Sequence, residues 1–123
     1  MTSRTVSMQR FETTERMSQA VVHGESIFLS GQVDKTKSTS VAEQTAAVLA
    51  RIDALLDSAG SDKAHIISAN IWLADIGNFA EMNSVWDKWV APGAAPTRAT
   101  VEARLADPKY HVEIAVIAAR KAP

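Results

Sequence analysis

Residues 95–119, APTRATVEARLADPKYHVEIAVIAA, decide how the chain is expected to fold. Apolar and polar side chains alternate over 98–105 and again over 110–119, which is the period-two pattern of a half-buried strand. The Asp-Pro-Lys sequence at 107–109 separates the two runs and is typical of a tight turn. We therefore expect an antiparallel pair of neighbouring strands, in which Arg98 opens the first strand and Glu113 lies inside the second.

Two helices and four further strands precede this pair. Ser40 and Glu43 have the spacing of a capping box, apolar residues then recur every three or four positions up to residue 59, and Gly60 follows as a cap. A second helix is expected from Asn78 to the Pro92-Gly93 stop. The expected strands are 6–11, 20–23, 26–30 and 66–73, the last with Ile67, Ala69, Ile71 and Leu73 on one face.

The predicted order is therefore β-β-β-α-β-α-β-β, an α+β fold with a six-stranded, mostly antiparallel sheet. Each helix is apolar along one stripe only, so both are expected to pack on one face of the sheet. The other face would carry a mixed set of side chains, among them Trp72 and Ile117, which are poor solvent residues. An antiparallel sheet can leave one face wet, so this pattern alone leaves oligomerisation open.

The composition limits the classes of function. At 123 residues the chain forms a single domain, 1–123, with one core. The formal net charge of -1, without a basic cluster, argues against nucleic acid as the main partner. No apolar run reaches the ~20 residues that span a bilayer, and the N-terminus has no apolar core of a signal peptide, so we expect a cytoplasmic protein without a membrane partner. The absence of cysteine excludes a thiolate nucleophile and a cysteine-based zinc site.

Arg98 and Glu113 are the residues of greatest chemical interest. A guanidinium fork matches the two oxygens of a small carboxylate, and a carboxylate such as Glu113 can orient or deprotonate an attacking water. In the predicted hairpin an even-length loop places both side chains on one face. A four-residue loop separates them by about 13 Å, a two-residue loop brings them closer, and an odd-length loop puts them on opposite faces.

The sequence pattern alone is also compatible with purely structural roles for these residues. Arg98 is also compatible with a solvated strand start, and Glu113 with a surface ion pair. His111 and Glu113 are two positions apart, but His23 and His65 are not spaced to complete a metal site, so we expect no metal. Gly31 follows a strand, where it is suited either to a turn or to a close backbone approach by a ligand.

Over nearly its whole length, the chain resembles the RidA/YjgF family of enamine and imine deaminases. The similar stretches are MSQAVV at 17–22, LSGQ at 29–32, ANIWLADI at 69–76, FAEMN at 79–83 and, most specifically, APTRATVE at 95–102 with VEI at 112–114. The WDKW sequence at 86–89 and PKY at 108–110 are most similar to the YoaB-like branch.

The resemblance implies a homotrimer whose sheets form a central barrel, with helices outside and three sites in clefts between subunits. It implies that Arg98 holds the substrate carboxylate, that Glu113 holds the hydrolytic water, and that backbone groups at Gly31 and Thr100 contact the substrate. Asn83 matches a family residue near the cleft. Neither a metal nor a cofactor is implied.

Two positions depart from the family pattern. Many members carry a tyrosine where this chain has Met17, so a phenol that could bond substrate, water or product is missing at this substrate-binding position. Many also carry a cysteine where this chain has Thr100, which matters less if only the backbone is used. Both departures bear on substrate range and rate.

The expected function is metal-free hydrolysis of reactive 2-imino or enamine acids to 2-keto acids and ammonia, as in a 2-iminobutanoate/2-iminopropanoate deaminase. The main rival is a binding module that holds a keto acid or another small carboxylate in the same cleft without turnover, and Met17 favours it. An RNA-acting or chaperone-like role is a second rival, which the near-neutral charge disfavours. A chorismate-mutase-like enzyme would share the fold class but needs a second cation in the cleft, for which Arg104 is the only obvious candidate.

Overall fold

The computed structural model describes residues 7–122 and contains one six-stranded sheet with two helices. Val6, the predicted start of the first strand, lies outside the described residues. The strands are β1 (Met8–Thr13), β2 (Ser18–His23), β3 (Ser26–Leu29), β4 (Ile66–Leu73), β5 (Thr97–Glu102) and β6 (Val112–Ala119), and the helices are α1 (Val41–Ser58) and α2 (Phe79–Trp89). Short 3-10 turns, η1 (Lys63–His65) and η2 (Ile76–Asn78), precede β4 and α2. The predicted α+β class and element order are confirmed.

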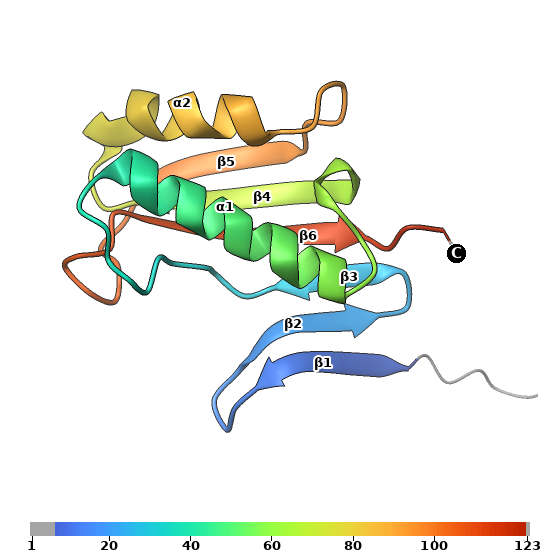
Figure 1. Cartoon of the computed structure of the whole chain (residues 1–123). Coiled ribbons are helices and arrows are strands. Elements are labelled where there is room, and N and C mark those ends of the chain that lie inside the picture. Colours follow the sequence, from blue (N-terminus) through green and yellow to red (C-terminus); the bar gives the residue numbers. More distant parts are fainter. Residues whose placement is uncertain (1–6, 123) are drawn as a thin grey trace, which may run out of the picture.

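Both helices cover the same face of the sheet, as predicted (Figure 1). The Ser40 Oγ accepts a hydrogen bond from the Glu43 amide at 3.0 Å, and Gly60 has a φ of 86°, so both predicted caps of α1 are formed. Asn78 makes no side-chain cap on α2, although it directly precedes that helix. Instead Glu81 of α2 accepts a hydrogen bond from the Ala42 amide at the start of α1, which ties the two helices together.

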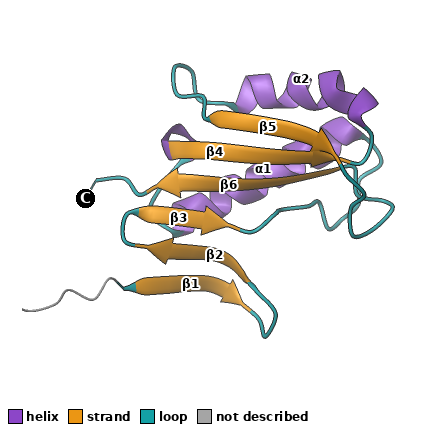
Figure 2. Ribbon diagram, turned by 180° about the vertical axis from the view of Figure 1, so that it is seen from behind, coloured by secondary structure: helices purple, strands orange, loops and turns teal. Residues whose placement is uncertain are grey.

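The predicted hairpin between the last two strands is wrong. The strand order is β1-β2-β3-β6-β4-β5, so β4 lies between β6 and β5 (Figure 2). β5 pairs with β4 in parallel, and β6 pairs with β4 in antiparallel. The physical reason is that α2 connects β4 to β5, and a crossover that contains a helix joins parallel neighbours. Residues 103–111 connect β5 back to β6. The predicted turn at 107–109 is present, since the Tyr110 amide donates a hydrogen bond to the Asp107 carbonyl at 3.0 Å, but it lies within this connection and does not join two paired strands.

The alternation in β4 also starts differently from the prediction. A register shift between Ile66 and Ser68 leaves Ile66 buried and Ile67 52% exposed. Ile67 therefore does not share the buried face with Ala69, Ile71 and Leu73, as had been expected. A bulge of this kind inserts one residue and reverses the facing of what precedes it.

Among residues 7–122, no element covers the sheet face opposite the helices (Figure 2). Phe28 is 44% exposed there and pairs with Ile117 on the adjacent strand. Val101 is 49% exposed and pairs with Trp72, while Met8 is 50% exposed near the sheet edge. We call this surface the open face, and its large apolar residues are Met8, Val21, Phe28, Trp72, Val101 and Ile117. An apolar surface of this breadth is typical of an interaction site.

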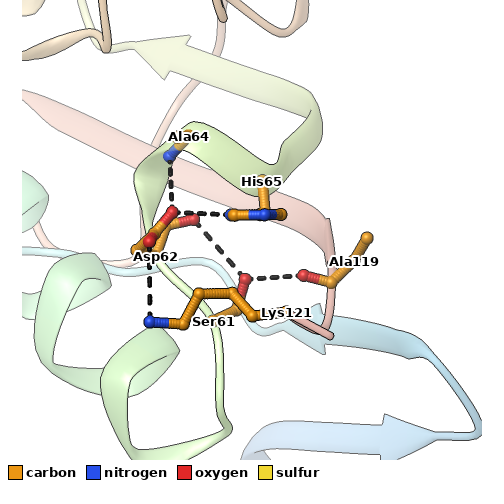
Figure 3. Close-up of polar contacts among 6 residues, drawn as sticks. All are labelled: Ser61, Asp62, Ala64, His65, Ala119 and Lys121. Carbon is orange, nitrogen blue, oxygen red and sulfur yellow. Dashed lines mark hydrogen bonds and ion pairs between the residues drawn. The ribbon is translucent and has the colours of Figure 1, made fainter. Parts of the chain in front are cut away.

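A polar cluster fastens the end of β6 to the connection between α1 and β4 (Figure 3). The Ser61 Oγ donates a hydrogen bond to the Ala119 carbonyl at 2.6 Å, and Asp62 Oδ1 shares a hydrogen bond with His65 Nδ1 at 2.7 Å. The contact with His65 is the main cause of a lowered pKa at Asp62. Ser61 makes no hydrogen bond to His65, so these residues lack the serine–histidine contact of a catalytic triad. The cluster holds two parts of the chain together. Among residues 7–122, no helix combines the length and the apolar character needed to cross a bilayer.

Candidate active site

Arg98 lies beneath α2, on the face of the sheet that the helices cover. It pairs with Ala69, which is 1% exposed, and its Nη1 donates a hydrogen bond to the Asn83 Oδ1 at 2.7 Å. The guanidinium carbon also lies 5.6 Å from the ring centroid of Phe79 and 5.2 Å from that of Trp86. The structure thus brings Arg98 and Asn83 into contact.

Thr100 occupies the same face of β5, two residues after Arg98, and pairs with Ile71. Its Oγ1 is buried and has no hydrogen-bond partner among the described residues. A buried hydroxyl without a partner costs stability, and such groups in native proteins call for an explanation. A ligand atom or water beside Arg98 is one group that this hydroxyl can bond, so both backbone and side chain of Thr100 are suited to a contact.

Glu113 lies on the open face, where β6 begins, and pairs with Trp72. Its side chain makes no hydrogen bond or ion pair within residues 7–122, and burial raises the pKa of its carboxyl above the ordinary value. A carboxylate in this state retains its acceptor sites for a water molecule and is a stronger base than an exposed one.

Gly31 is in contact with this carboxylate. A Cβ at Gly31 would overlap the Glu113 Oε2 and would lie 2.8 Å from its Cδ, well inside van der Waals contact. The glycine is therefore required by the close approach of Glu113 to the backbone. Met17 is 42% exposed and directly precedes Ser18, whose carbonyl accepts a hydrogen bond from Ser30 Oγ at 2.6 Å. Met17, Gly31 and Glu113 thus belong to one end of the sheet.

The candidate residues form two groups within one chain, which we call the arginine group (Asn83, Arg98 and Thr100) and the glutamate group (Met17, Gly31 and Glu113). An even-length hairpin loop would have placed Arg98 and Glu113 on one face. Because β4 lies between β5 and β6, their side chains instead point to opposite faces of the sheet. Arg98 and Glu113 pair with residues of β4 that are three positions apart, which corresponds to about 10 Å along the strand. Because β4 lies between β5 and β6, the two residues are also separated by about 10 Å across the sheet. With side chains on opposite faces, one chain cannot bring both to the same small ligand.

His111 and Arg104, which the sequence analysis also considered, belong to neither group. His111 Nε2 lies 2.9 Å from the Thr39 carbonyl oxygen, and no group of three potential metal ligands occurs in the described part of the chain. Arg104 is exposed on the connection after β5. The contacts of Phe79 and Trp86 with Arg98 were not predicted, since both were assigned only to the apolar stripe of their helix. Their spacing with Asn83, four and then three residues, is the signal that could have identified them.

Comparisons with known proteins agree with the fold and the motifs. The sequence model of the family described as Endoribonuclease L-PSP matches residues 7–120. The RutC family protein YoaB of Escherichia coli is 44% identical over 114 residues, covering 93% of this chain and 99% of that protein. The crystal structure of a YjgF family member from Neisseria meningitidis is 51% identical with a TM-score of 0.94, covering 96% of this chain and 98% of that one.

A more distant relative carries a functional name. The chloroplastic Reactive Intermediate Deaminase A of Arabidopsis thaliana is 31% identical over 107 residues, which cover 82% of this chain and 57% of that protein. Together these matches define a class of small α+β proteins. The chain belongs to the RidA/YjgF family, also described as the L-PSP or RutC family, and is similar to its YoaB-like members.

Proposed function

We propose that this protein hydrolyses reactive 2-imino or enamine acids to 2-keto acids and ammonium, at sites formed where the arginine group of one chain meets the glutamate group of another. The observation that carries this proposal is Glu113, a half-buried carboxylate with a raised pKa and no partner within the described chain. The relative named as a reactive intermediate deaminase supports the same reaction class.

The open face supports the need for a second chain. Exposed Met8, Phe28 and Val101, on three different strands of this face, are apolar groups that association would remove from water. Three copies in a closed ring would bury the face on every chain without leaving an unmatched surface. We propose a homotrimer with this face turned inward, in which each cleft between subunits contains one arginine group and one glutamate group.

The chemistry follows from the two groups. Arg98 would bind the substrate carboxylate. Glu113 would take a proton from a water molecule while the oxygen of that water forms a bond to C2 of the protonated imine. Glu113 would return this proton to the nitrogen of the resulting carbinolamine. The C–N bond then breaks as the hydroxyl proton passes to the departing ammonia, and the products are a 2-keto acid and ammonium. Positioning and general-base assistance of about 10²–10⁴-fold would suffice for an imine, which already hydrolyses in water.

The imine-trapping assay tests the proposal directly. An amino-acid oxidase generates the imines of leucine, methionine and alanine in place, and semicarbazide reports their disappearance. We expect acceleration by the wild type that is lost in Arg98→Ala and Glu113→Ala but kept in Arg104→Ala, which removes an exposed arginine close by in the chain. Absence of acceleration for every imine would refute the enzyme.

The binding-module alternative gives a different pattern in the same variants. Calorimetric titration with 2-oxobutanoate would then show binding to wild type and Glu113→Ala but not to Arg98→Ala, while none of the three proteins would accelerate imine hydrolysis. Met17, which lacks the phenol of many family members, is the feature that favours this alternative. A role in the cytoplasm as a scavenger of metabolites released by other enzymes follows only if turnover is seen.

A further inference from the structure

The face of α2 that meets β5 carries three residues directed at one guanidinium. Phe79, Asn83 and Trp86 are spaced i, i+4 and i+7, so they form a single stripe along the helix. Asn83 bonds to Arg98 Nη1 at 2.7 Å, and the rings of Phe79 and Trp86 lie 5.6 and 5.2 Å from Arg98 Cζ. Both distances are within the range of cation–π contacts.

These contacts restrict Arg98 in complementary ways. An aromatic ring near a guanidinium favours particular orientations of the guanidinium plane and excludes water from one side of it. The hydrogen bond to Asn83 then fixes rotation within that plane and occupies a single nitrogen. An arginine held in this way loses little further freedom when a carboxylate binds its remaining N–H groups, which lowers the entropic cost of binding.

The two rings differ in how firmly they are held. Trp86 is 6% exposed, and its ring centroid lies 5.3 Å from that of Trp89. Trp89 Nε1 in turn donates a hydrogen bond to Asp53 of α1 at 3.0 Å, so Trp86 rests on a support that reaches the other helix. Phe79, at the start of α2, is 41% exposed and is the more exposed of the two rings next to Arg98.

We propose that Phe79 and Trp86 are positioning residues that hold the Arg98 guanidinium in the orientation required for the substrate carboxylate. This inference rests on the proposed function, because the ligand is the carboxylate of a 2-imino or 2-keto acid. The rings do not touch the reacting atoms. They act through Arg98, and their removal weakens carboxylate binding without removing the cation.

Binding of 2-oxobutanoate, measured by calorimetry, tests the role of Phe79. We expect Phe79→Ala to raise Kd by about 3- to 30-fold, the range of a cation–π contact, and Phe79→Tyr to restore the wild-type value because it keeps the ring. Ile76→Ala is the matched control, since Ile76 is 44% exposed just before α2 and supplies neither the hydrogen bond nor a ring to Arg98. Trp86→Phe should lie between wild type and Phe79→Ala.

A second readout does not depend on any ligand. In ¹⁵N-edited NMR spectra, the Arg98 Nε–H signal, assigned by its loss in Arg98→Ala, should be displaced by ring currents. It should move toward the position of solvated arginines in Phe79→Ala and stay in place in Phe79→Tyr and Ile76→Ala. A merely structural contribution of Phe79 would lower the melting temperature without this pattern.

The outcomes separate the two proposals. If wild-type protein binds no 2-keto acid and accelerates no imine, the proposed function fails, and the displaced Arg98 signal alone decides whether the rings hold the guanidinium. If wild type binds 2-oxobutanoate and Arg98→Ala does not, but Phe79→Ala binds as tightly as wild type, the proposed function stands and the inference is overturned.

Discussion

The arginine group and the glutamate group are built in opposite ways. Arg98 is surrounded by partners from its own chain: an amide oxygen and two aromatic rings, all on α2. Within residues 7–122, Glu113 has no side-chain partner and stands on the sheet face that no described element covers. A single chain therefore supplies the contacts that hold Arg98 but supplies no side-chain partner for Glu113. This difference is the reason for proposing that the site forms when chains assemble.

The largest expected effect comes from separating the chains. Phe28→Asp places a charge on the open face, where burial against another chain would require its desolvation. We expect chains that elute as monomers from size-exclusion chromatography and hydrolyse imines no faster than buffer. Ile76→Asp, which alters an equally exposed apolar residue away from this face, should keep assembly and activity. A monomeric Phe28→Asp with full activity would show that each chain carries its own site.

A smaller effect is expected where Gly31 meets Glu113. The Cβ of Gly31→Ala would displace the carboxylate, so we expect kcat to fall about 10- to 100-fold while the Kd for 2-oxobutanoate, which depends on Arg98, stays near that of wild type. In a Glu113→Ala background the same change should cost nothing more, since the displaced group is gone. Additive losses in the double variant would contradict this account of the glycine.

The contrast between the two groups shows how much of the molecule the sequence predicts. The Ser40 cap and the apolar stripe of α1 depend on neighbours in the chain and were predicted correctly. The position of β5 was not, because two alternating runs around residues 107–109 are also compatible with a hairpin. The helix between β4 and β5, which makes them parallel neighbours, carried the information that was overlooked.

The candidate site follows the same division. Arg98, Glu113 and Asn83 were identified through motifs, and contact between Arg98 and Asn83 is now observed. The facing of Arg98 relative to Glu113 depends on which strands are adjacent, which is a long-range property. Because β4 separates β5 from β6, the common face expected for an even-length hairpin loop does not form. The roles assigned to all six candidate residues remain predictions.

The smallest expected effect concerns the raised pKa of Glu113. A carboxyl whose pKa is higher in the folded than in the unfolded protein contributes stability at low pH, and this contribution is lost as pH rises through the folded pKa. Glu113→Gln should therefore melt at a higher temperature than wild type at pH 8, with the difference vanishing below the ordinary carboxyl pKa. Calorimetric melting across this pH range measures the difference. A lower melting temperature for Glu113→Gln at pH 8 would indicate a hidden ionic partner.

The same titration should govern catalysis. With Glu113 acting as a base, kcat/KM should rise with pH through the raised pKa of its carboxyl and then level off, as long as the imine remains protonated. The imine-trapping assay, run from pH 5 to pH 8, records the profile. Glu113→Gln should give low activity without this rise, so the same rise in the variant would assign the titration to another group.

Complementation between inactive chains tests the central claim most directly. Arg98→Ala and Glu113→Ala proteins, each inactive alone, are unfolded together, refolded as a mixture and assayed for imine hydrolysis. If Arg98 of one chain works with Glu113 of its neighbour, random assembly gives both wild-type groups at about one quarter of the sites, and about a quarter of wild-type activity should return. If each site draws both residues from one chain, every site lacks one of them, and a mixture as inactive as its components would contradict the account.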